Sequence, residues 1–212
     1  MMRKIFVETT YGTYRANCED YRLDQGTIDA YLDAKAENDY LQLRGIKLAV
    51  AMEALKAALQ KLPRVNVQGY ILEDSDFKSI RRKIEKFVRD ELKAENVGPT
   101  QRDAICKKLS ELNRRPFKAI LTGLFDYIDL RVDEQDLALF IKSRDSLVHQ
   151  GRFYYETATL DDRKQVEPFN SEIEEYCFLV NFLDRVFLKL LGYRGPYIDR
   201  RMPNQQIHRE QV

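Results

Sequence analysis

Arg144 and His149 lie five positions apart near the end of a predicted helix, and Asp145 follows the arginine directly. Histidine titrates near neutral pH, so His149 can give or accept a proton there. Arg144 stays charged and presents a planar set of donors that matches a phosphate. Together these groups can cleave a phosphodiester without a metal. The imidazole can move the proton of a ribose 2′-hydroxyl or of the leaving oxygen, and the guanidinium can stabilise the phosphate charge. Asp145 would orient the site through hydrogen bonds.

A structural interpretation of the same residues stays open. An arginine and a histidine at this spacing often occur by chance, His149 suits a helix C-terminus, and Arg144 can pair with a carboxylate. Five residues turn an ideal helix by about 140°, so the two side chains do not share one face. They can flank a groove if the helix ends at Gly151, a candidate C-cap. Two such helix ends about a two-fold axis would bring two arginines and two histidines into one cleft.

The segment Arg144–His149 resembles the R-x4-6-H motif of the HEPN superfamily, including the polar residue that often follows the arginine. Residues 43–55 and 139–153 are similar to an early and a late helix of the ApeA-like HEPN group, and the resemblance spans about residues 38–192. It implies a helical domain that often forms a homodimer. Many members are metal-independent endoribonucleases of toxin–antitoxin or antiviral defence systems, whereas others bind nucleotides or proteins and cleave nothing.

Two features of the resemblance bear on the site. HEPN toxins that are paired with nucleotidyltransferase antitoxins carry a tyrosine two residues after the histidine, and Gly151 stands there in this chain. Control by modification of such a tyrosine is therefore not expected. Arg44 and Glu53 match residues typical of the first ApeA-like helix, which implies that they support the site, Glu53 by meeting Arg144 or His149. The alternative is that both are surface charges.

The overall composition excludes several classes of protein. The 212 residues carry a net charge of +1, so any RNA binding must come from a local patch. Three cysteines without C-x-x-C spacing and two isolated histidines argue against a disulfide framework and a metal site. The chain shows no signal peptide, no apolar run that could span a membrane and no glycine-rich nucleotide-binding motif. We expect a cytoplasmic protein without a cofactor.

Three places could supply a local RNA-binding patch. Arg114 and Arg115 are adjacent in a predicted turn, and Arg152 and Tyr154 lie in a predicted polar loop over residues 151–167. The alternatives are an ordinary exposed turn and aromatic packing. The helix predicted over residues 74–95 also carries a basic stripe, which is either a solvated face or a phosphate-tracking surface. Its members are Lys78, Arg81, Arg82, Lys83, Lys86 and Arg89.

Hydrophobic periodicity and capping signals predict an all-α fold, a HEPN-like bundle of about six helices with a short β-like N-terminal arm. Helix-forming residues run through 24–60, and further helices are expected over 74–95, 100–112, 117–130, 133–150 and 171–191. The last of these is apolar enough to be either deeply buried or part of a dimer interface. The predicted domains are an arm over 1–23, a HEPN-like helical domain over 24–192 and a polar tail over 193–212. The arm is interpreted either as a plain extension or as the remnant of an upstream domain.

Two functions remain in view. The first is a HEPN-type endoribonuclease, a dimer in which Arg144 holds the scissile phosphate, His149 handles the proton and Asp145 orients, leaving 2′,3′-cyclic phosphate ends. An antitoxin or an upstream sensor domain would be its further partner. The second is a non-catalytic helical module that binds a protein or a nucleotide. A structure in which Arg144 and His149 face an open cleft shared by two subunits would favour the nuclease. A structure in which carboxylates enclose both residues inside one subunit would favour the module.

Overall fold

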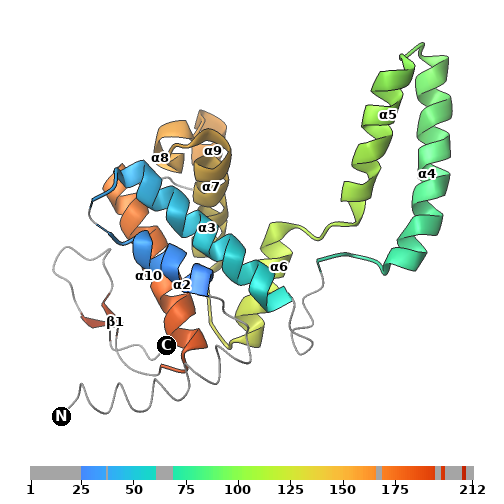
Figure 1. Ribbon diagram of the computed structural model, residues 1–212. Helices are drawn as coiled ribbons and strands as arrows, with labels where there is room; N and C mark the ends of the chain where they lie inside the picture. Colours follow the sequence, from blue (N-terminus) through green and yellow to red (C-terminus); the bar gives the residue numbers. More distant parts are fainter. Residues whose placement is uncertain are drawn as a thin grey trace. The chain divides into compact units, whose positions relative to one another are not determined.

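The computed structural model describes residues 25–36, 38–60, 69–165, 169–193, 197–198 and 207–208. These residues are mostly helical, which confirms the all-α class (Figure 1). They divide into two compact units, one that combines residues up to 60 with those from 121 onward, and one that comprises residues 69–120. The N-terminal arm predicted over residues 1–23 lies outside the described residues.

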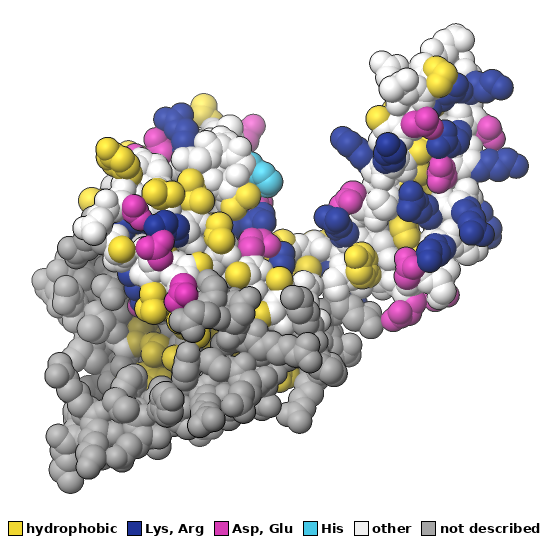
Figure 2. Space-filling view, viewed as in Figure 1, with side chains coloured by type: hydrophobic (Ala, Val, Ile, Leu, Met, Phe, Trp, Pro, Cys, Tyr) yellow, Lys and Arg dark blue, Asp and Glu magenta, His cyan; other side chains and the backbone are white. Residues whose placement is uncertain are grey.

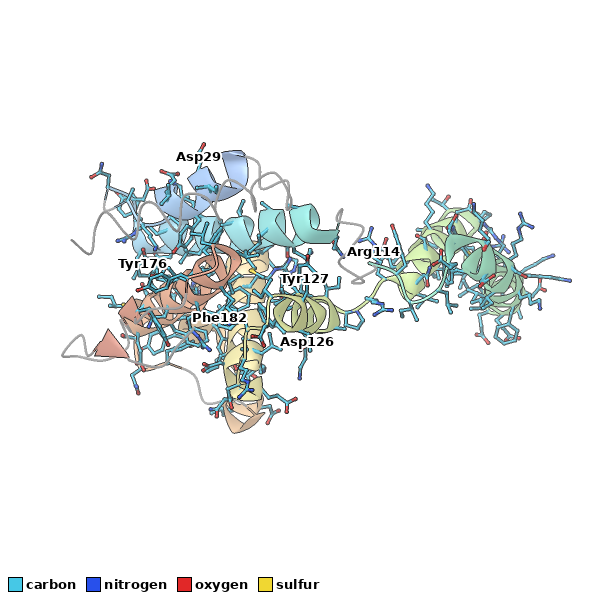
Figure 3. All side chains as sticks on the ribbon, turned by 90° about the horizontal axis from the view of Figure 1, so that it is seen from below. Asp29, Arg114, Asp126, Tyr127, Tyr176 and Phe182 are labelled. Carbon is cyan, nitrogen blue, oxygen red and sulfur yellow. The ribbon has the colours of Figure 1, made fainter. Side chains whose placement is uncertain are left out.

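The first unit is organised around α10 (Glu172–Leu190), which packs against α3 (Leu41–Gln60), α7 (Glu134–Gln150) and α8 (Tyr154–Thr157), while α2 (Gln25–Asp33) lies along α3 (Figure 1). Tyr176 and Phe182 extend from α10 into this interior (Figure 3). The Phe182 ring stacks on Phe140 of α7 at 4.2 Å. Of the two interpretations of the last helix, the buried one is therefore confirmed.

The helical stretch predicted over residues 24–60 is broken, and α2 and α3 are separate helices with a turn between Ala34 and Tyr40. The turn is stabilised by Lys47, whose ammonium lies 2.5 Å from both Asp33 and Asp39. The break lets α2 fold back along α3. Helix propensity alone does not reveal it, because a local break becomes favourable only when the two apolar faces pack together.

Helix α7 begins and ends where the sequence predicts. Asp133 caps its start by accepting a hydrogen bond from the Gln135 N–H at 2.7 Å. Gly151 ends it in the left-handed conformation, with φ +68°, and donates to the Leu147 carbonyl. The last predicted helix was expected to begin at residue 171, and Ser171 caps α10 there, because its Oγ accepts from the Glu174 N–H at 3.2 Å.

The polar loop predicted over residues 151–167 is wrong in part, since it contains α8 and a further short helix, α9 (Leu160–Gln165). The start of α8 is capped from a distance. Glu175 of α10, whose side chain is fully buried, accepts the N–H groups of Tyr154 and Tyr155 at 2.9 and 2.8 Å. A helix of four residues depends on such a tertiary cap in addition to its local one, in which Glu156 accepts the Phe153 N–H at 3.1 Å.

The second unit is a helical hairpin of α4 (Asp74–Ala94) and α5 (Pro99–Lys108), followed by the 3-10 turn η1 (Leu109–Asn113). Phe77 and Cys106 are the buried apolar residues of its two helices. At its base, the buried side chain of Asn113 exchanges two hydrogen bonds of 2.9 Å with the backbone of Leu72. The hairpin therefore has a thin core and a base closed by polar contacts.

The remaining elements complete the chain. Helix α6 (Phe117–Tyr127) begins in the second unit and ends in the first. Strands β1 (Tyr197–Ile198) and β2 (Ile207–His208) pair antiparallel within the stretch predicted as a polar tail. Among the described residues, no helix combines the length and apolar character that crossing a membrane requires.

Candidate functional site

Arg144 is held between two carboxylates at the contact of α3 and α7. Its Nη2 donates to Glu53 Oε1 of α3, and its Nη1 donates to Asp145 Oδ1 at 2.5 Å. The arginine side chain is 17% exposed, so its charge is largely removed from water. The sequence-based prediction that Glu53 meets Arg144 or His149 is realised as a contact with Arg144.

A glycine allows α3 and α7 to approach closely. A Cβ atom added at Gly45 of α3 would lie 3.0 Å from the Phe153 ring and 3.1 Å from Leu147, and both of these side chains are buried. The sequence shows Gly45 only as a weak point in a helix. In the structure Gly45 makes room for the Phe153 ring, which follows the turn after α7. This contact holds α3 and the end of α7 close together at the site.

Glu53 belongs to a small network of alternating charges. Its second oxygen, Oε2, accepts from Lys56 at 2.5 Å, so Lys56, Glu53, Arg144 and Asp145 form a chain of two cations and two anions. Burial by itself lowers the pKa of Arg144, but the hydrogen bond to Asp145 and the charge of Glu53 outweigh it and raise that pKa above its ordinary value. The guanidinium therefore remains charged and has a defined orientation.

His149 lies apart from this network. It is exposed in the last turn of α7, and no hydrogen-bond or ion-pair partner is found for it within the described residues. An ideal helix places it about 7.5 Å further along the axis than Arg144 and turned by about 140°. Within one protomer, Arg144 thus faces α3, while the imidazole points to a different side of α7.

The segment that follows His149 is held in place by hydrogen bonds from the side chains of Ser146 and Glu175. Ser146 Oγ donates to the Arg152 carbonyl at 2.8 Å and lies 2.7 Å from Thr157 Oγ1. Glu175 binds the same segment through the two N–H groups of α8. Burial raises the pKa of Glu175, and its hydrogen bonds to the backbone oppose that rise. Glu175 is not among the residues predicted for the site, although its position gave a signal: it stands four and eight residues before the buried Leu179 and Leu183 on one helix stripe.

Tyr154 is not placed for the RNA-binding role that the sequence suggested. Its side chain is 4% exposed, and the Lys142 ammonium lies 5.3 Å from the centre of its ring. A ring enclosed in this way cannot stack on a base, so the structure corrects this prediction in favour of aromatic packing. Arg152 remains accessible with 62% of its side chain exposed, and it pairs with Glu156 at 3.1 Å.

Arg44 lies away from Arg144. Its Nη2 donates to the Tyr176 hydroxyl at 2.6 Å, and its guanidinium lies 4.4 Å over the same ring. Its Nε also donates to the carbonyl of Ala34 at the end of α2. Nine residues separate Arg44 from Glu53, which is about two and a half turns of an ideal helix, so the two face opposite sides of α3. Arg44 thus supports the packing of α2 and α10, and the structure does not bring it to Arg144.

The two arginines of the predicted turn lie in the second unit. Arg114 is 66% exposed and pairs with Glu111 at 2.9 Å. Arg115 donates its Nε to the Tyr70 carbonyl at 2.9 Å, which closes the base of the hairpin. Arg114 thus keeps an accessible charge, whereas part of the guanidinium of Arg115 has a structural role.

Comparisons of this chain with models of protein families, with curated proteins and with solved structures find no match.

Proposed function

We propose that this protein is a metal-independent endoribonuclease that acts as a homodimer. The observation that carries the proposal is the contrast along α7: a guanidinium oriented by two carboxylates, and five residues later an exposed imidazole without a partner among the described residues. The first can hold a phosphate, and the second can transfer a proton near neutral pH. The resemblance to the HEPN motif supports the same reaction.

In the proposed reaction, the ribose 2′-oxygen attacks the phosphorus and the bond from phosphorus to the 5′-oxygen breaks. One imidazole accepts the proton of the 2′-hydroxyl, and a second, protonated imidazole gives a proton to the 5′-oxygen. Arg144 stabilises the charge that develops on the phosphate. The products are a 2′,3′-cyclic phosphate and a 5′-hydroxyl, and His149 supplies both imidazoles if two protomers share the site.

The separation of Arg144 and His149 in one protomer is the reason for invoking a dimer. A two-fold axis near the end of α7 would place His149 of one protomer beside Arg144 of the other. Val148, next to the histidine, is apolar and 41% exposed, which suits an interface at this end of the helix. Asp145 is 49% exposed, so it is the partner of Arg144 that can turn aside most easily when a phosphate binds.

A specific observation favours the second candidate, a non-catalytic helical module. Glu53 and Asp145 already satisfy much of the guanidinium of Arg144, as an arginine with a structural role requires. In that case Arg144 joins α3 to α7, and the chain binds a protein or a nucleotide without cleaving RNA.

Incubation of the purified protein with RNA in EDTA tests these alternatives. We expect cleavage with 2′,3′-cyclic phosphate ends, and we expect Arg144→Ala and His149→Ala to abolish it. Gln150→Ala, a change at the exposed neighbour of His149, is the matched control and should cleave like the parent. Circular dichroism checks that each variant keeps its helices. Cleavage by His149→Ala at the parental rate would reject the assignment, and a parent chain that leaves RNA intact would favour the module.

A further inference from the structure

The second unit, which contains the α4–α5 hairpin, carries an excess of positive charge. Residues 69–120 contain thirteen lysines and arginines against nine aspartates and glutamates, a net charge of +4 in a chain whose total is +1. The other residues therefore sum to −3. Figure 2 shows lysine and arginine side chains spread over the surface of this hairpin. The charge of residues 69–120 differs in sign from that of the other residues, which directs a negatively charged partner to this unit.

Five of these cations share one face of α4. Lys78, Arg82, Lys86, Arg89 and Lys93 follow one another at intervals of four, four, three and four residues. On an ideal helix they fall within a sector of about 80° and extend over about 22 Å, and the carboxylates of α4 lie outside that sector. We call this set the basic face. The other two cations of α4, Arg81 and Lys83, lie outside this sector.

Three members of the basic face have no anionic partner among the described residues. Lys78 pairs with Asp74 at 2.8 Å, and Arg89 pairs with Glu85 and Asp103 at 3.0 and 2.7 Å. Arg82, Lys86 and Lys93 are exposed, and none of them forms an ion pair with another described residue. Arg82, Lys86 and Lys93 therefore leave three positive charges along one face of α4 that phosphate groups can contact.

The basic face ends at a hollow of about 220 Å³ near the tip of the hairpin. The charged residues that line it are Arg89, Asp90, Lys93, Arg102 and Asp103. Helix α5 starts there at Pro99, so the positive end of its dipole lies at the same place.

The orientation of the hollow's central arginine is fixed. The hydrogen bonds to Asp103 and Glu85 raise the pKa of Arg89, and the same contact with Arg89 lowers the pKa of Asp103. Both carboxylates direct the guanidinium and together more than offset its single charge. Lys93 and Arg102 are the other cations of the lining and Asp90 is its second carboxylate, so the lining holds three cations against two carboxylates and keeps a small positive charge for a phosphate group.

The exposed apolar side chains of α4 lie on a different side of the helix from the basic face. Ile80 and Phe87 are 42% and 66% exposed, and on an ideal helix they lie about 140° or more from the middle of the basic face. Any partner that covers these apolar side chains therefore leaves the cations open. The separation also differs from a membrane-surface helix, in which basic residues flank the apolar face that enters the lipid.

We propose that the basic face of α4 and the hollow at its end bind the sugar–phosphate backbone of RNA without reading its sequence. The choice of RNA rests on the proposed function, and the backbone contact follows from the charges of the hairpin. Phosphates recur every few ångströms along a strand, so a face of about 22 Å runs beside several of them. Binding of this kind holds the strand while Arg144 and His149 act on one of its phosphates.

The test measures binding of a fluorescent single-stranded RNA to the full-length chain by anisotropy, over a range of salt concentrations. All variants carry His149→Ala, which removes cleavage from the measurement. The hairpin variant is Lys86→Glu with Lys93→Glu, and the matched control is Lys83→Glu with Lys108→Glu. The control has the same net charge and changes exposed cations of the same hairpin outside the basic face and the hollow.

We expect the hairpin variant to bind RNA at least about tenfold more weakly than the control variant, with a salt slope reduced by about 1.4 for two lost phosphate contacts. Equal weakening of both variants would overturn the proposal, as would parental binding by the hairpin variant. Loss of binding to vesicles that contain anionic phospholipid, with RNA binding unchanged, would assign the basic face to a membrane instead. Failure here leaves the nuclease proposal standing, because that is judged by cleavage in the His149 and Arg144 variants.

Discussion

Changing Glu53 to Gln removes one charge of the ion pair that holds Arg144, and its effect on stability can be bounded from the structure. Two unit charges about 4 Å apart attract by about 4 kcal/mol at an effective dielectric constant near 20. Desolvation offsets much of this attraction, and breaking a fully buried pair costs about 3–5 kcal/mol. Here the two side chains remain 17% and 30% exposed, and Asp145 still balances the arginine. We therefore expect Glu53→Gln to lower the free energy of unfolding by about 1–2 kcal/mol.

A double-mutant cycle isolates the pair from other effects of the substitutions. Urea unfolding is followed by circular dichroism for the parent, Glu53→Gln, Arg144→Gln and the double variant, and we expect a coupling energy of about 1 kcal/mol or more. The pair between Lys78 and Asp74 is the control, because its side chains are 65% and 80% exposed and its coupling should be only about 0.3–0.5 kcal/mol. A coupling for Glu53 and Arg144 no larger than the control value would refute the conclusion that Glu53 holds the guanidinium.

The same variant separates positioning from binding in the proposed nuclease. Glu53 contacts Arg144, and in the proposed nuclease it acts through that residue, so Glu53→Gln should lower kcat while KM for RNA changes little. The measurement is made at a temperature at which the variant is fully folded. A change confined to KM would show that Glu53 acts on RNA binding and not through the orientation of Arg144.

Two further predictions concern the scaffold of the site. Gly45→Ala should destabilise the protein by about 1–2 kcal/mol in urea unfolding, because contact with the buried Phe153 ring outweighs the gain of about 1 kcal/mol in helix propensity; a more stable variant would contradict the close approach. Glu175→Gln should destabilise it by about 1–3 kcal/mol, because the amide cannot accept both N–H groups at the start of α8. The pKa of Glu175 is raised in the folded protein, so ionisation of this residue opposes folding. The parent should therefore lose part of its stability advantage over Glu175→Gln as pH rises above 4.5, the ordinary pKa of glutamate. Unfolding measured from pH 4 to 8 checks this, and an advantage that grows with pH would contradict the direction of the pKa shift.

The parts of the fold that were predicted correctly depend on short-range signals. Asp133 and Gly151 bound α7, and Ser171 caps α10, because capping satisfies backbone groups within a few residues of the helix end. The burial of α10 follows from apolar residues on most of its circumference. The resemblance of residues 43–55 to an ApeA-like helix implied that Glu53 meets Arg144 or His149, and Glu53 does contact Arg144.

The parts that were missed depend on contacts between distant segments. The turn that separates α2 from α3 is stable because Lys47 meets two aspartates across it. Helix α8 exists because a buried carboxylate some twenty residues later accepts its first N–H groups. Tyr154 looked like an exposed loop residue, and the same contact draws it into the core. The division of the predicted helical domain into two compact units also has no local signal, since it depends on which helices pack together.

By itself, the sequence determined the helical class, the ends of α7 and the placement of Arg144, Asp145 and His149 on its last turns, because propensity, caps and helical periodicity act over a few residues. Only the tertiary structure decided that Glu53 of α3 holds Arg144 while His149 remains exposed on another side. The physical reason is that an ion pair between α3 and α7 requires the close packing that a glycine at position 45 permits, and that packing depends on residues about a hundred positions apart.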